Sequence, residues 1–351
     1  MIGLLNMETK REQELIGIIM NNSPISISEI QTKISEQISI PTLNRELAKL
    51  KSRNILLTEG KGPSLKYLIN LHQLTTIPIE LDLFFKTETD QRKILEKYNF
   101  EIFERLSQVE IFSESQKDIL KKLNDTFQEK KLSLSENQFT KEFERLMIEL
   151  SWKSSQIEGN TYDLLDTEHL LKYNEPSKSH SLEETQMLLN HKSAINYTFQ
   201  NRDLYESLSL GKITDIHTLL TEKMGISKNP RKRIVRITGT KYLPPDNEFI
   251  IVEALENLCK LINSKSNIFE KALLTILLIS YIQPFEDGNK RTARLTGNAL
   301  LMNDDACPLS YRSVNPTDYK KAMLLFYELN NISAFKEIFI KQYEFAVDTY
   351  F

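Results

Sequence analysis

Apolar positions follow two different periods in the first 72 residues. Three segments show apolar residues three or four positions apart, which is the spacing of a helix: 11–22, 26–35 and 39–54. The second segment opens with Ser26 and carries Glu29 three residues later, which is the spacing of a capping box. Two strand-like runs follow at 55–60 and 64–69, with a Lys-Gly-Pro turn signal between them. The pattern therefore predicts three helices followed by a β-hairpin.

Helical spacing dominates the rest of the chain, apart from one interruption. Between about 73 and 200 it marks four segments: 91–108, 115–131, 135–159 and 182–199. The segment 226–251 instead alternates β-branched and polar residues around Gly239 and stops at two prolines, which suits an extended flap or a hairpin between helices. Helical spacing resumes at 252–263 and 271–282. The fold class expected is mainly α, a helical bundle with a short β-hairpin flap behind a small N-terminal domain. We divide it into 1–72, 73–200 and 201–345.

Composition narrows the class of protein. With 351 residues, 40% hydrophobic and 26% charged, the chain can bury a large core. Its longest apolar run, 272–282, is well short of the ~20 residues of a membrane span, and the start lacks the pattern of a secretory signal. We therefore expect a cytoplasmic protein without a membrane partner. Cys259 and Cys307 fit neither a disulfide framework nor a zinc site.

The N-terminal pattern resembles a winged helix-turn-helix domain. Its third helix would expose polar side chains toward phosphates or base edges: Thr42, Asn44, Arg45, Lys49 and Arg53. Lys61 would lie at the tip of the wing. Nine cations against seven acids give residues 1–72 a net charge of only +2, which is a weak electrostatic footprint for nucleic acid. Two alternatives stay open. One is DNA binding through 39–66, and the other is a small protein-interaction or structural domain whose lysines form a solvated face.

A turn between two helices near residue 285 carries the candidate chemistry. The helix that ends near Ile282 is broken by Pro284, and a new helix begins near Asn289. Free backbone N–H groups and the dipole at such a helix start attract anions, and Gly288 lets a ligand approach the backbone. An ordinary helix start, with Asp287 as its cap, is the alternative.

Charged side chains beside this turn point to phosphate. Arg291 and Arg294 are three residues apart and share one helix face, so their guanidinium groups can grip successive phosphates. Lys290 adds a point charge. Asp287 is a candidate Mg²⁺ ligand, because Mg²⁺ in nucleotide sites commonly takes one or two carboxylates together with phosphate oxygens.

The run PFEDGNKRTAR, residues 284–294, resembles the signature of the Fic family, His-x-Phe-x-(Asp/Glu)-Gly-Asn-(Gly/Lys)-Arg-x-x-Arg. The matching positions are Phe285, Asp287, Gly288, Asn289, Lys290, Arg291 and Arg294. The resemblance covers about 140–345 and implies a Fic-type helical bundle that transfers AMP from ATP, with Mg²⁺, to a Ser, Thr or Tyr hydroxyl of a target protein. It implies that Asp287 holds the metal, Asn289 the α-phosphate, and Arg291 with Arg294 the outer phosphates. More loosely, it places Tyr319 and Asn330 at the adenosine.

Two further segments are similar to parts of that family. SSQIEGN, Ser154 to Asn160, resembles its inhibitory motif (Ser/Thr)-x-x-x-Glu-(Gly/Asn). This implies that Glu158 pairs with Arg294 and withholds it from the γ-phosphate. The segment 234–245 resembles the flap on which the target protein docks in an extended conformation.

One position departs from the signature. Gln283 stands where the family has its general-base histidine, and a glutamine has no group that titrates near pH 7. His217, in a predicted helix, is the first candidate for a replacement base, although a lone helical histidine is more often packed or solvated.

Three interpretations follow. The first is a Fic-type adenylyltransferase that is autoinhibited by Glu158 and weak or inactive because of Gln283. The second is a catalytically silent ATP-binding regulator whose winged helix binds DNA. The third is a phosphotransferase like the Doc branch of the superfamily, suggested by Lys290. The sequence does not decide the oligomeric state, and a homo-oligomer is one option.

Overall fold

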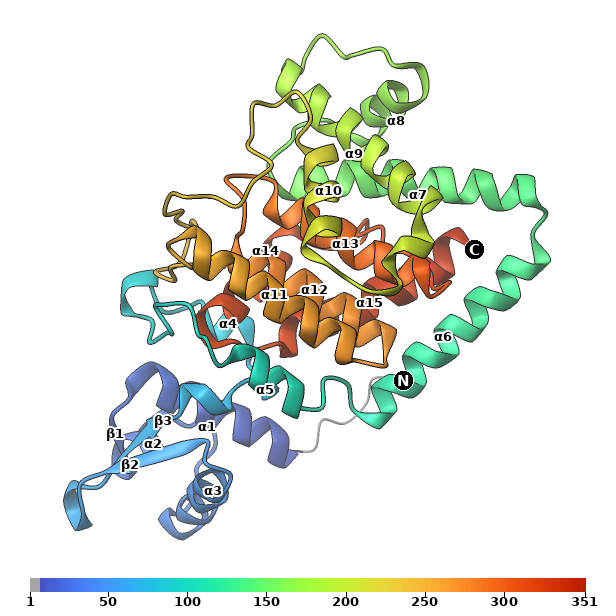
Figure 1. Ribbon diagram of the computed structural model, residues 1–351. Helices are drawn as coiled ribbons and strands as arrows, with labels where there is room; N and C mark the ends of the chain where they lie inside the picture. The colour runs from blue at the N-terminus through green and yellow to red at the C-terminus, as the bar shows by residue number, and fades with distance from the viewer. Residues whose placement is uncertain (1–6) are drawn as a thin grey trace. The chain divides into compact units, whose positions relative to one another are not determined.

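The computed structural model describes residues 7–351 and is mainly helical with one small antiparallel sheet (Figure 1). The predicted mainly α class is therefore confirmed. The chain forms two compact units. The first contains the chain up to Asn99 together with Ile237–Tyr242 and Lys320–Phe335, and the second contains the remainder. No helix in the described part of the chain is both long and apolar enough to cross a bilayer.

The first unit begins with helices and a three-stranded sheet. Its elements are α1 (Met7–Asn22), β1 (Ile25–Ser26), α2 (Ile27–Lys33), α3 (Ile40–Ser52), β2 (Leu56–Glu59), β3 (Lys66–Ile69) and α4 (Leu81–Phe84). The strand order is β1-β3-β2, and β2 pairs antiparallel with β3. The three helices, the hairpin and the capping box of Ser26 with Glu29 are confirmed. The short β1 was not predicted, because two residues are too few to show an alternation.

The prediction of helix over 91–108 is wrong for its first half. Only α5 (Ile102–Gln108) forms there. Arg92 instead makes a buried ion pair with Glu328, with Nη2 and Oε1 2.9 Å apart, and the N–H of Leu95 donates to the carbonyl of Glu328. These tertiary bonds hold the segment in a non-helical conformation against its local helical pattern.

The second unit is an all-helical assembly. Beside α5 it contains α6 (Glu114–Ser133), α7 (Glu136–Ile157), α8 (Leu164–Tyr173), α9 (Leu182–Gln200), α10 (Leu210–Leu220), α11 (Glu248–Ser264), α12 (Ile268–Ile282) and α13 (Asn289–Asn303). Two more helices, α14 (Pro316–Leu329) and α15 (Ser333–Tyr350), contribute residues to both units. Helix α13 is almost wholly buried, and it contacts α7, α9, α10 and α12, as can be followed in Figure 1.

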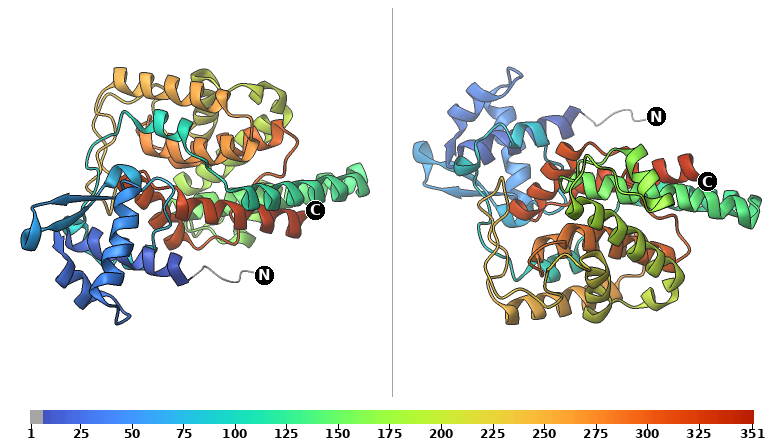
Figure 2. Two further views of the ribbon diagram at one scale, coloured as in Figure 1. Left: turned by 90° about the horizontal axis from the view of Figure 1, so that it is seen from below. Right: turned by 90° about the horizontal axis from the view of Figure 1, so that it is seen from above.

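The segment between α10 and α11 is drawn as a loop in all views of Figures 1 and 2. It turns at Gly239, where φ is +87°, as the sequence predicted. The structure assigns no run of β-strand within 226–247, so the flap is an irregular loop and not a paired hairpin. A strand needs a hydrogen-bonded neighbour, and the described sheet lies elsewhere, in β1, β2 and β3.

Candidate functional site

Gln283 ends α12 in a left-handed conformation and uses its side chain within the protein. Its φ is +49°, and it is 9% exposed. The Nε2 group donates to the carbonyl of Ser280 at 2.6 Å, and Oε1 accepts from Nδ2 of Asn289 at 3.1 Å. The amide therefore fixes the turn, and it provides no titratable group at the position where a general base is expected.

Asn289 stabilises the loop that follows Gln283 through its side-chain amide. Its Oδ1 accepts from the N–H of Phe285 at 2.8 Å, and its Nδ2 donates to the carbonyl of Phe285 at 2.8 Å as well as to Gln283. The phosphate-binding role of Asn289 stays a prediction. In this structure its amide shapes the loop.

The start of α13 lacks a side-chain cap. The N-cap residue is Gly288, with φ of +79°, and no side chain caps the helix there. The alternative in which Asp287 caps the helix is therefore wrong. A Cβ at Gly288 would come within 3.1 Å of Cγ2 of Thr221, so a glycine fits best. Uncapped N–H groups at a helix start attract an anion.

Arg291 adds an unused donor to this helix start. It is 2% exposed, and its Nη2 contacts Oδ2 of Asp287 at 3.1 Å. Its buried Nη1 has no hydrogen-bond partner among the described residues. Burial lowers the pKa of the guanidinium, and the Asp287 carboxylate acts in the opposite direction. A buried donor of this kind is costly unless a ligand satisfies it, so the residues fit a phosphate.

The carboxylate of Asp287, beside the start of α13, could serve as a ligand for Mg²⁺. The side chain of Asp287 is 65% exposed, so one of its oxygens can face a bound metal. Among the described residues, no group of three or more His, Cys, Asp or Glu could hold a metal ion. The protein would therefore supply Asp287, and the nucleotide would supply further oxygen ligands, as is usual for Mg²⁺.

Arg294 is fully buried and held from α7. Its Nη1 lies 2.9 Å from Oε1 of Glu158, while Nε donates to Oγ of Ser154 at 2.9 Å and Nη2 donates to the Ser154 carbonyl at 2.8 Å. Nζ of Lys290 lies 3.3 Å from the other Glu158 oxygen. Burial alone would raise the pKa of Glu158, but Arg294 and Lys290 outweigh it and hold the pKa below its usual value. The Glu158 carboxylate thus pairs with two cations of the motif, Lys290 and Arg294.

Residues 207–301 match the model of the Fic/DOC family. This part of the chain is a Fic domain. The chain is 29% identical over 174 residues to Protein adenylyltransferase Fic of Nematostella vectensis, which covers 48% of this chain and 40% of that protein. It is 24% identical over 202 residues to Protein adenylyltransferase fic-1 of Caenorhabditis elegans, covering 55% and 39%. The matches thus span about two fifths of these relatives.

Solved Fic structures share the fold. The structure of Fic-1 from C. elegans, residues 134–508, matches with a TM-score of 0.57 at 18% identity, over 67% of this chain and 70% of that one. A Fic domain containing signaling protein from Bacteroides thetaiotaomicron matches with a TM-score of 0.56 at 20% identity, over 66% and 94%. The Fic-type helical fold expected from the sequence is therefore confirmed.

His191 supports the contact between α7 and the Fic domain. Its Nε2 lies 3.0 Å from Oγ of Ser154, which also accepts from Arg294. Burial lowers the pKa of His191 to about 3, and the nearby cations act in the same direction. The imidazole is therefore neutral near pH 7. Sequence reasoning missed this role, because a histidine within a helical pattern carries no signal of its partner.

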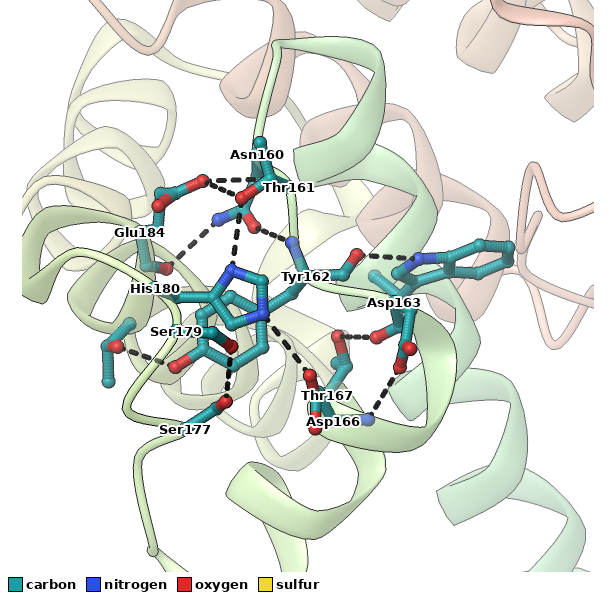
Figure 3. A network of polar contacts seen from close by, with 12 residues as sticks. Asn160, Thr161, Tyr162, Asp163, Asp166, Thr167, Ser177, Ser179, His180 and Glu184 are labelled. Atoms are coloured by element: carbon teal, nitrogen blue, oxygen red, sulfur yellow. Dashed lines mark hydrogen bonds and ion pairs between the residues drawn. The ribbon is translucent and has the colours of Figure 1, made fainter.

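The turn that follows Glu158 is fixed by a polar network (Figure 3). Oε1 of Glu184 accepts from the backbone N–H and from Oγ1 of Thr161, at 2.8 and 2.6 Å. The His180 ring lies between Oγ1 of Thr161 and the Asp166 carboxylate, at 3.0 and 3.2 Å. Hydrogen bonds from Thr161 and from Ser181 lower the pKa of Glu184 to about 2. This network fixes the chain just beyond the carboxylate that holds Arg294.

His217 packs against the motif loop, the turn of residues 283–288 between α12 and α13. Its ring stacks on that of Phe285, with centroids 3.6 Å apart and planes 9° apart. Because a carbonyl only accepts, Nε2 carries the proton and donates to Asp287 O at 3.0 Å. Burial lowers the pKa of His217 to about 4. These bonds make His217 a positioning residue for the loop and a poor replacement base.

Arg231 fastens the flap to the same loop, a role that sequence reasoning missed. Its side chain is buried and donates to backbone carbonyls of Gln283 and Pro245 at 2.7 Å and of Arg233 at 2.8 Å. It thereby joins both ends of the flap to the residue at the general-base position. Arg231 lies in a run of lysines and arginines, and the sequence does not show which of these cations is buried.

The two residues predicted near adenosine behave differently. Tyr319 is buried, and its hydroxyl lies 3.5 Å from Nη1 of Arg294. Asn330 belongs to the first unit, where its amide bonds to Asn99 and to the Phe326 carbonyl. The adenosine contacts of both residues stay a prediction.

Proposed function

We propose that the Fic domain binds Mg-ATP at the start of α13 and is built for transfer of AMP to a protein hydroxyl. The observation that carries the proposal is the uncapped helix start beside the unpartnered Nη1 of buried Arg291. The adenylyltransferase names of its relatives support AMP as the transferred group. In this proposal Arg291 and Arg294 bind the outer phosphates, Asn289 the α-phosphate, and Asp287 the Mg²⁺ that offsets phosphate charge.

The proposed reaction needs a base, which the chain lacks at position 283. The target hydroxyl oxygen forms a bond to the α-phosphorus, the bond from that phosphorus to the bridging oxygen breaks, and pyrophosphate leaves. The hydroxyl proton must pass to a base, and Gln283 cannot accept it. A positioned base contributes roughly 10²- to 10⁴-fold to such a rate, so we expect a weak enzyme.

The second part of the proposal is autoinhibition by Glu158. A γ-phosphate and the Glu158 carboxylate would compete for Arg294 and Lys290, which the carboxylate now holds. The full chain and its Glu158→Gly form can be incubated with ATP labelled at the α- or the γ-phosphate. Label on protein from the α position supports AMP transfer. Label from the γ position alone would instead identify a phosphotransferase.

A catalytically silent, ATP-binding regulator is the second candidate. It is favoured by the engaged side chain of Gln283 and by an N-terminal helix, α3, that exposes Asn44, Arg45 and Lys49. Arg53 is partly engaged, with Nη1 2.6 Å from Oε1 of Glu12. Under this candidate the N-terminal elements form a winged helix that binds DNA. ATP-dependent binding of DNA that is lost in Arg45→Ala, without label transfer, would support it.

A further inference from the structure

The Fic domain carries an acid-free basic segment. Residues 223–245 include seven lysines and arginines and no aspartate or glutamate, although the net charge of the full chain is -3. We call residues 223–236 the basic flap segment; they all belong to the second unit. Its Lys228, Lys232, Arg233 and Arg236 are exposed. A concentration of one sign of charge on a chain of the opposite net sign indicates a charged partner.

Most of these four cations have no acidic partner among the described residues. Within the described part of the chain, Lys232 alone among these four pairs with an acid, Oε2 of Glu248, at 3.3 Å. That contact brings the start of α11 beside the segment, and with it the exposed Phe249. The residues Ile234 and Phe249 are 63% and 85% exposed. The surface thus combines cations with two apolar side chains, a composition that suits a peptide.

The basic flap segment is also tied to the motif loop. Arg231, within it, donates to the carbonyl of Gln283 at 2.7 Å and to that of Arg233 at 2.8 Å. A peptide bound along 232–236 would therefore lie close to the loop where the acceptor hydroxyl has to be placed. Position and charge together limit the kind of peptide that fits.

We infer that the basic flap segment binds a target protein through an acidic stretch next to its acceptor hydroxyl. Carboxylates of the target would pair with Arg233 and Arg236, and an apolar residue would contact Ile234 or Phe249. This inference rests on the proposed function, because it names the substrate class of the same site. Nucleic acid is the other polyanion that such a surface could attract, and the test below separates the two.

Binding of short fluorescent peptides to the full chain tests the inference. Each peptide has a central threonine, flanked by Asp and Glu, by Asn and Gln, or by Lys. We expect the acidic peptide to bind at least about tenfold more tightly than the neutral one, and the preference to weaken with salt. Arg233→Glu with Arg236→Glu should abolish the preference. The matched control, Lys260→Glu with Lys341→Glu, reverses two exposed cations elsewhere in the same unit and should leave it unchanged.

Equal affinity for acidic and neutral peptides would overturn the inference, as would an equal loss in both double variants. Tighter binding of single- or double-stranded oligonucleotides, lost in the Arg233→Glu/Arg236→Glu variant, would overturn it in favour of nucleic acid. Label transfer separates this inference from the proposed function. AMP transfer without any acidic preference removes the inference alone. Acidic peptide binding without AMP transfer by any activated variant removes the transferase and leaves the docking surface.

Discussion

Glu158 and Arg294 form an ion pair across 136 positions of the chain, with Oε1 and Nη1 2.9 Å apart. The arginine is fully buried, and the carboxylate is held by Lys290 as well. Two further bonds from Arg294 to Ser154 lock the guanidinium to α7. A phosphate that needs Arg294 must therefore displace a carboxylate that is already well placed.

Replacing Glu158 by glutamine should tighten Mg-ATP binding. The substitution keeps the size of the side chain and removes the charge that competes with phosphate. We expect a gain of about five- to a hundredfold, the usual size of such a coupling, measured by calorimetry. Loss of the ion pair should also lower the melting temperature without ATP, because Arg294 is left buried with less compensation.

Glu175→Gln is the matched control for that experiment. Glu175 is an exposed acid that pairs with His169, so its replacement should change neither affinity nor melting temperature. The same ATP affinity in Glu158→Gln and in the unaltered chain would remove the autoinhibition.

Arg291 should be needed for ATP and not for the fold. Among the residues that the structure describes, Arg291 forms one ion pair, with the exposed Asp287, and its buried Nη1 has no hydrogen-bond partner there. Arg291→Ala should weaken Mg-ATP binding by roughly tenfold or more, since charge-assisted hydrogen bonds contribute about 1.5–3 kcal/mol. Arg291→Lys should recover only part of this, because a lysine lacks the planar fork. Unchanged affinity by calorimetry would contradict the placement of phosphate at this residue.

The pH dependence of a Gln283→His variant should report the new imidazole alone. The pKa values of His191 and His217 lie near 3 and 4, so both stay neutral at higher pH. In the unfolded chain both imidazoles bind a proton at about pH 6.5, so the free energy of unfolding should fall as pH drops from about 6.5 toward 3. Above that range these two histidines should not change it. Any rate change between about pH 5.5 and 8 that is present in the variant and absent from the unaltered chain then belongs to residue 283.

A rate change of the same shape in the unaltered chain would mean that another group titrates at the site. A His217→Gln form, which keeps a side chain able to donate to the Asp287 carbonyl, then shows whether that group is His217.

Arg231 should hold the flap in place. Its guanidinium donates to the backbone carbonyls of Gln283, Arg233 and Pro245, and a lysine cannot reach all three. Arg231→Lys should therefore raise amide hydrogen exchange over residues 232–236, followed by mass spectrometry, while exchange in α12 stays slow. Lys232→Ala, which removes one exposed ion pair, is the control and should have little effect. Equal exchange in all three proteins would contradict a positioning role.

Local patterns predicted much of the fold. The capping box of Ser26 with Glu29, the hairpin after α3 and the helix start at Asn289 all follow from short-range signals and are confirmed. The segment near Arg92 could not be predicted, because its partner Glu328 lies 236 positions away. The functions of the site residues stay predictions. Their geometry depends on contacts such as those of Arg231 and His191, which no spacing in the sequence reveals.

We propose that this Fic domain retains the machinery for AMP transfer and lacks only its base. Restoring the base in the relieved background tests it most directly. Glu158→Gly and Glu158→Gly with Gln283→His are incubated with Mg-ATP labelled at the α-phosphate, and label on protein is measured. We predict that the double variant gains on the order of 10²-fold over the single one, the usual contribution of such a base. A double variant that binds Mg-ATP and yet stays as silent as the single one would contradict the claim and favour the ATP-binding regulator.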